Sequence, residues 1–141
     1  MNQTMPAIQT DLQKIEDAIH RYQSEVDVKS ECQSKETAAL ERINETKVSI
    51  NELGSVLDAA RKAGVAKVDI ANTEAMLKST QQWLERNMAD HERYRNDRLQ
   101  IENELVSNAK KIKTAIDLIA PYCTSPDDQA RLQALRRNME S

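Results

Sequence analysis

Apolar side chains recur along most of this chain at alternating spacings of four and three residues. A repeat that averages about 3.5 residues is slightly shorter than the turn of a straight α-helix, so the apolar stripe stays on one side only if the helix coils around a neighbour. The pattern therefore predicts coiled-coil helices. In the first half of the chain the stripe consists of Ile8, Leu12, Ile15, Ile19, Tyr22, Val26, Leu40, Ile43, Ile50 and Leu57. In the second half it consists of Leu77, Leu84, Met88, His91, Leu105, Ala109, Ile112, Ile116 and Ile119.

Two residues set the expected helix ends. Gly64 is a plausible C-terminal cap, which predicts a first helix over about 6–63. Gly54 is an alternative end, but the apolar phase continues past it and one mid-helix Gly costs only about 1 kcal/mol. Pro121 disfavours helical geometry in the residue before it, which predicts a second helix over about 69–119.

The two helices have similar lengths and a short turn at about 64–69, so they form an antiparallel hairpin. At about 1.5 Å per residue, each arm would be on the order of 75 to 85 Å long, and we expect an elongated molecule. A third helix is predicted over about 126–139, because Ser125 is a favourable N-cap and Pro126 a favourable first residue. Its apolar side should fold back near Ile8 and Ile119.

Composition excludes several other classes. The chain has 141 residues, which suits a single all-α unit, and its two Gly, three Pro and four aromatic residues argue against a β-rich fold. No apolar run approaches the roughly 18 residues of a membrane span or forms a signal-peptide core. Cys32 and Cys123 are too few for a disulfide scaffold, so reduced thiols and a cytoplasmic location are expected. They lie far apart on the expected hairpin, so any disulfide would have to join two chains.

No catalytic, cofactor or metal site is expected. The segment from His91 to Arg95 resembles the H-E-x-x-H zinc helix only in its first two residues, because Arg95 occupies the position of the second histidine ligand. The chain lacks a Gly-rich phosphate loop and a nucleophile elbow. Carboxylates on an exposed helix lack the concave pocket that acid–base catalysis requires. The sequence therefore favours a protein without enzymatic activity.

Each stripe becomes polar near its middle, and the expected register brings the two polar stretches to the same level. We predict that Glu36 pairs with Arg95 or Arg98, and Lys29 with Glu102, since an unpaired charge in an apolar seam is costly. This layer either sets the register of the helices or forms a weak point where a partner enters. Its members are Lys29, Gln33, Glu36, His91, Arg95, Arg98 and Glu102.

Extra apolar width near the turn indicates a further packing surface. Met76 and Trp83 lie one position before Leu77 and Leu84, and a two-helix hairpin needs only a narrow seam. Trp and Met are favoured in protein interfaces. We expect a second copy of the chain to pack there, a dimer being favoured, with a foreign protein as the alternative. The candidate residues are Met76, Leu77, Trp83, Leu84 and Met88.

The predicted function is therefore non-enzymatic protein–protein interaction, as a scaffold, adaptor, tether or assembly chaperone. The alternative is a small nucleic-acid-associated or phage-type regulatory protein that uses a mildly basic end of the hairpin. The net charge of -3 disfavours nucleic acid as the main partner, and no small-molecule substrate is expected. The residues of the basic end are Lys110, Lys111, Lys113, Arg131, Arg136 and Arg137.

Overall fold

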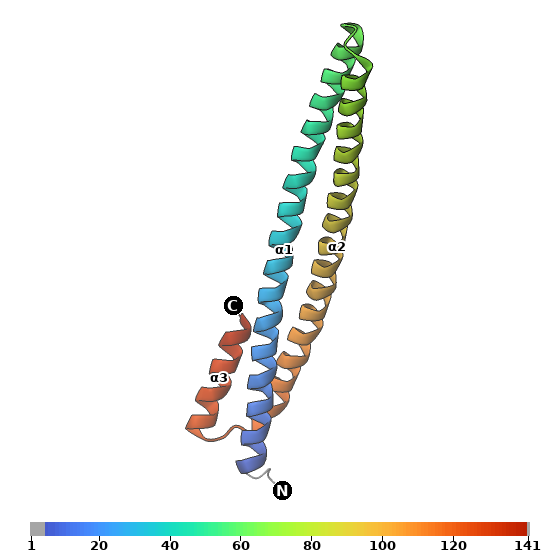
Figure 1. The fold of residues 1–141 in the computed structure, drawn as a ribbon. Helices are drawn as coiled ribbons and strands as arrows, with labels where there is room; N and C mark the ends of the chain where they lie inside the picture. The colour runs from blue at the N-terminus through green and yellow to red at the C-terminus, as the bar shows by residue number, and fades with distance from the viewer. Residues whose placement is uncertain (1–4, 141) are drawn as a thin grey trace. The chain divides into compact units, whose positions relative to one another are not determined.

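The computed structural model describes residues 5–140, and within them it is helical with no strand. Helix α1 spans Met5–Lys62, α2 spans Lys67–Ile119, a 3₁₀ turn η1 spans Ala120–Tyr122, and α3 spans Pro126–Glu140. Helices α1 and α2 pack against each other as a hairpin, and the short α3 lies alongside the N-terminal part of α1 (Figure 1). The predicted all-α hairpin with a short third helix is confirmed.

The helix ends follow the sequence signals. Helix α1 continues through Gly54 and ends in a Schellman motif, in which Val65 N–H donates to the Ala60 carbonyl over 3.1 Å and Gly64 N–H to the Arg61 carbonyl over 3.4 Å. Gly64 has a φ of 71°, a left-handed conformation that favours glycine. Helix α2 ends at Ile119, two residues before Pro121, as predicted.

The chain divides into two compact units, which are described separately. The base unit comprises residues 5–30 and 99–140 of the described chain, and the turn unit comprises residues 31–98. Whether the two units behave as the single unit expected from chain length stays a prediction. Within residues 5–140, none of the helices combines the length and the apolarity that a bilayer crossing requires.

The base unit has a core built by three helices. Helix α3 begins with Ser125 as its N-cap, whose Oγ accepts a 3.1 Å hydrogen bond from Asp128 N–H. Its apolar side then packs on both arms of the hairpin, near Ile8 and Ile119 as predicted. The buried cluster consists of Ile8, Leu12, Ile15, Ile19, Ile112, Ile116, Ile119, Cys123, Leu132, Leu135 and Met139.

The turn unit contains only segments of α1 and α2, so its interior is much narrower. Its buried apolar residues, among those described, are Ala39, Ile43 and Leu57, and Thr46 and Asn87 are buried beside them. Large apolar side chains remain on its surface, because two helices alone enclose only a narrow seam. They include Leu40, Val48, Val56, Met76, Trp83 and Met88, each at least 46% exposed.

Candidate functional site

In the turn unit, one of the two buried rows of α1 is the predicted one and the other is not. Within the turn unit, burial on α1 follows one row through Glu36, Ile43, Ile50 and Leu57 and a second through Cys32, Ala39, Thr46 and Leu53. The first row was predicted. The second lies one position before the expected residues Gln33, Leu40 and Lys47, which are exposed.

The expected residues belong to what we call the outer rows, two seven-residue rows of the predicted stripe. On α1 the outer row is Leu12, Ile19, Val26, Gln33, Leu40 and Lys47, and on α2 it is Met88, Arg95, Glu102, Ala109 and Ile116. In the base unit Leu12, Ile19 and Ile116 are buried in the cluster that includes α3. In the turn unit every outer-row residue is exposed. An outer row is therefore core only where a third helix covers it.

This finding corrects part of the predicted polar layer. Gln33 and Arg95 do not lie on the seam: both are exposed, and Arg95 pairs with Glu92 of its own helix over 4.0 Å. The prediction assumed that both rows of the stripe face the same neighbour. In the turn unit only one of the two predicted rows, the one that includes Glu36 and Ile43, faces α2. The other predicted row, the outer row that includes Gln33, points to water. His91 does lie at the seam, where it is half-buried.

Glu36 is paired with Arg98 across the hairpin, as the register predicted. Arg98 Nε donates to Glu36 Oε2 over 2.5 Å and Arg98 Nη2 donates to Oε1 over 3.3 Å, so the contact is bidentate. The hydrogen bond from Arg98 is the main reason why the pKa of the Glu36 carboxyl is lowered; partial burial opposes this effect, and the charge of Arg98 reinforces it. The pair is therefore held in its charged form at neutral pH.

Lys29 and Glu102 form the second predicted pair, within the base unit. Lys29 Nζ lies 3.6 Å from Glu102 Oε1, and both side chains are 31% exposed. An exposed pair of this kind adds little stability, because water and salt screen it. Its position still matches the predicted register.

Asn87 is a buried polar residue that sequence reasoning missed. It is 2% exposed, its Oδ1 accepts a 3.3 Å hydrogen bond from Arg42 Nε, and its Nδ2 has no partner among the described residues. Buried Thr46 lies one turn of α1 beyond Arg42 and donates to the Arg42 carbonyl over 2.6 Å. The available signal was a seven-residue row of Thr73, Thr80, Asn87 and Tyr94, one position before the row that includes Met88 and Arg95.

The five predicted self-association residues lie in three different settings. Leu77 and Leu84 are half-buried in the seam. Met76 and Trp83 are 59% and 50% exposed, and Met88 is 50% exposed. Trp83 and Met88 are five residues apart, which places them about 140° apart around a helix. Met76 and Trp83 share one flank of the hairpin, while Met88 belongs to the opposite flank with the outer rows.

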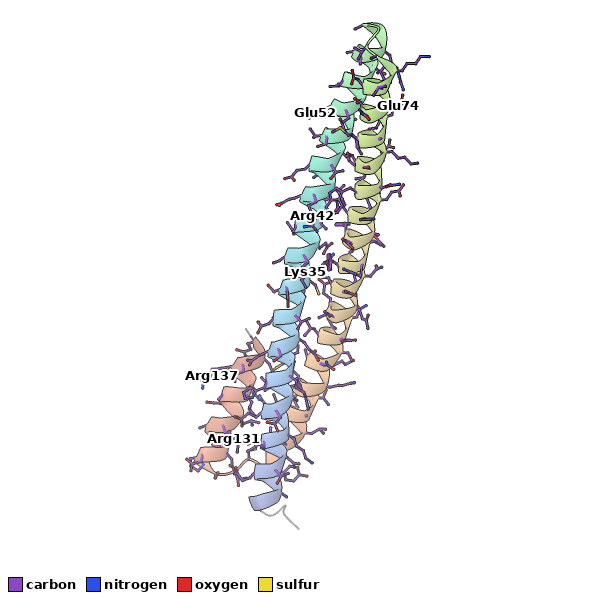
Figure 2. All side chains as sticks on the ribbon, viewed as in Figure 1. Lys35, Arg42, Glu52, Glu74, Arg131 and Arg137 are labelled. Atoms are coloured by element: carbon purple, nitrogen blue, oxygen red, sulfur yellow. The ribbon has the colours of Figure 1, made fainter. Side chains whose placement is uncertain are left out.

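The predicted basic end is partly neutralised. Arg131, labelled on α3 in Figure 2, has its Nη2 2.8 Å from Glu16 Oε2. Arg136 Nη2 lies 3.4 Å from Asp117 Oδ1, so both arginines fasten α3 to the hairpin. Arg137 is exposed. Lysines 110, 111 and 113 are also exposed but face different grooves of the base unit. The six residues therefore do not form one continuous basic patch.

No catalytic arrangement emerges from the described residues. Within 5–140, no group of three or more His, Cys, Asp or Glu side chains is placed to hold a metal ion. Both cysteines are free, and burial, followed by the charge of Asp128, raises the pKa of the Cys123 thiol. No protein-family model, curated protein or solved structure matches the chain. The remaining observations concern the exposed apolar and charged surfaces of the two units.

Proposed function

We propose that this protein is a non-enzymatic protein–protein interaction module, and that its first partner is a second copy of itself. The observation that carries the proposal is the exposed pair Met76 and Trp83, which lie seven residues apart on one flank of α2 in the turn unit. A half-exposed Trp beside an exposed Met is typical of an interface and atypical of a surface that meets only water.

Side chains of α1 reach across the seam toward the flank of α2 that carries Met76 and Trp83. Arg42, labelled on α1 in Figure 2, reaches across the seam to Asn87, and Asn87 is a helix neighbour of both Trp83 and Asp90, so these residues border the same flank. Lys35 also reaches across, with its Nζ 5.9 Å from the centre of the Tyr94 ring.

The charges around this flank are mixed: on α1 Lys35 Nζ lies 3.5 Å from Glu31 Oε1, and on α2 Arg93 Nη2 lies 3.8 Å from Asp90 Oδ1, so neither helix presents one sign of charge. A second copy related by a two-fold axis would cover both Met76 and Trp83 without bringing two surfaces of strong like charge together. Such a dimer would form a four-helix bundle around the turn unit. The proposal includes a reducing compartment such as the cytoplasm, because both cysteines are free.

Light scattering over a concentration series tests the proposal. We expect a dimer whose dissociation constant rises at least about tenfold in Trp83→Ala, because an interface Trp commonly contributes more than about 2 kcal/mol. Met76→Ala should also weaken the dimer. Met88→Ala is the matched control, since it removes an equally exposed Met from the opposite flank and should leave the mass unchanged.

A chain that stays monomeric at every concentration would refute self-association. Weakening by Met88→Ala to the same degree as by Met76→Ala would refute the choice of flank. Affinity for DNA or RNA that falls steeply with added salt would favour the alternative, a nucleic-acid-associated protein.

A further inference from the structure

The base unit contains an open groove on the same side of the hairpin as α3. The groove has a volume of 850 Å³ and an apolar lining of Tyr22, Val26, Leu105, Val106 and Ala109. Val26 is 41% exposed and Val106 is 72% exposed, so this lining meets water in the isolated chain. We call it the open groove.

The open groove continues the interface that α3 already occupies. Both are lined by the outer rows: α3 covers Ile19 on α1 and Ile116 on α2, and one heptad further along the rows Val26 and Ala109 line the open groove. The C-terminal end of α3 borders a small cavity with Lys113 and Asp117, and both of these residues also line the open groove. The open groove therefore begins where α3 ends, and its rows have the helical spacing that accepts a further helix.

The charges beside the groove change at the point where α3 ends. Helix α3 is held by two arginines, Arg131 on Glu16 and Arg136 on Asp117. The equivalent positions beside the open groove lie seven residues further along each helix. Gln23 corresponds there to Glu16, and Lys110 corresponds to Asp117. A second helix with arginines at the positions of Arg131 and Arg136 would find no carboxylate at these positions, and one of its arginines would face the positive charge of Lys110. This disfavours the α3 of another copy as the occupant.

Two lysines give the open groove a positive edge. Lys110 and Lys113 line it, lie three residues apart on one side of α2, and make no ion pair with any described residue. At the other end of the groove Lys29 is already paired with Glu102. The uncompensated charge of the groove is therefore positive and lies along its α2 wall.

We propose that the open groove binds an amphipathic helix of another protein, one that packs Leu-type side chains on the outer rows and places Asp or Glu side chains against Lys110 and Lys113. The occupant lies end to end with α3 and extends its interface. This inference deepens the proposed protein-binding function, but it uses a different surface from the flank of Met76 and Trp83.

The test uses two synthetic, fluorescently labelled helical peptides with the same Leu pattern at spacings of four and three residues. One peptide has Glu at the flanking positions and the other has Lys. We expect fluorescence anisotropy to show binding of the Glu peptide at least about tenfold tighter than that of the Lys peptide at low salt, because two ion pairs become two repulsions. The difference should shrink as salt is added.

Variants of the chain locate the site. The double variant Lys110→Glu/Lys113→Glu should weaken the Glu peptide about tenfold and strengthen the Lys peptide. Lys111→Glu is the matched control, because Lys111 lines a groove with Ala18 and Ile112 on the other flank and should leave both affinities unchanged. Val106→Asp should weaken both peptides, since it puts a charge into the apolar lining. Circular dichroism establishes that each variant remains helical.

Several results would overturn the proposal: no binding of either peptide at low salt, equal affinity for the two, or a loss in Lys111→Glu as large as in the double variant. A loss of peptide binding as the chain associates with itself at higher concentration would assign the groove to a second copy. Failure here is separable from failure of the proposed dimer. Trp83→Ala should leave peptide affinity unchanged, and Lys110→Glu/Lys113→Glu should leave the mass unchanged.

Discussion

Glu36 and Arg98 form a bidentate ion pair between the two arms of the hairpin, at the point of the turn unit where apolar side chains are replaced by charged ones. Their side chains are 17% and 21% exposed, so the pair is partly shielded from water. A shielded, bidentate pair with a satisfied geometry stabilises the alignment of the helices more than an exposed pair does.

Glu36→Gln should therefore lower the free energy of unfolding by about 1 to 2 kcal/mol at neutral pH. The folded-state pKa of Glu36 lies below its unfolded value, so its contribution is present above the unfolded pKa and is lost as the pH falls through the folded pKa. The difference between wild type and variant should vanish once the pH has fallen below the folded-state pKa of Glu36. Urea titrations across pH measure it. Glu41→Gln, an exposed control, should change the free energy of unfolding at neutral pH by less than about 0.5 kcal/mol, and a Glu36→Gln effect that persists in acid would contradict the ion-pair explanation.

Asn87→Leu should raise the free energy of unfolding by up to about 1 kcal/mol, because it replaces a buried donor without a partner by an apolar side chain, and the half-buried Arg42 that loses its 3.3 Å hydrogen bond to Asn87 Oδ1 can bind water instead. Asn108 is the matched control, three heptads further along the same row. Its Nδ2 donates to Glu25 Oε2 over 3.1 Å, so Asn108→Leu removes a formed hydrogen bond and should not stabilise the chain. Thermal unfolding compares the two. Equal stabilisation by both changes would show that the unmet donor is not the cause.

Leu135→Ala should lower the free energy of unfolding by about 2 to 4 kcal/mol, because Leu135 is 3% exposed in the core that joins α3 to the hairpin. Leu118→Ala changes the same residue type at a site that is 70% exposed, and it should cost less than about 0.5 kcal/mol. Chemical denaturation followed by circular dichroism measures both. A small effect at Leu135 would mean that α3 is not firmly packed.

The two glycines should respond in opposite directions to alanine. Gly54 lies inside α1 with no atom near the position of an added Cβ, so Gly54→Ala should stabilise the chain by about 0.5 to 1 kcal/mol. Gly64 has a positive φ, so Gly64→Ala should destabilise it by about 1 kcal/mol. The midpoints of thermal unfolding give the sign directly. Destabilisation by Gly54→Ala would contradict an uninterrupted α1.

Cys32 should react with a thiol reagent well before Cys123. Cys123 is 4% exposed and burial raises its pKa, which reduces both access and the thiolate fraction, whereas Cys32 is only half-buried. Timed alkylation followed by mass spectrometry of the peptides gives the two rates. In denaturant the rates should become similar. Equal rates in the native chain would show that the packing around Cys123 opens readily.

The helices and their ends could be predicted from the amino-acid sequence, because these depend on local chemistry. Gly64 allows the left-handed residue that ends α1, Pro121 stops α2, and Ser125 caps α3. The pairing of Glu36 with Arg98 was also predictable, since a short turn between two long helices leaves little freedom in the level at which residues meet.

The tertiary structure alone decided which apolar rows are core. Ile19 and Leu40 occupy equivalent positions three heptads apart, yet Ile19 is 1% exposed and Leu40 is 46% exposed, because α3 covers one and nothing in the described chain covers the other. Spacing shows that a row is apolar, but it does not show how many neighbours the helix has.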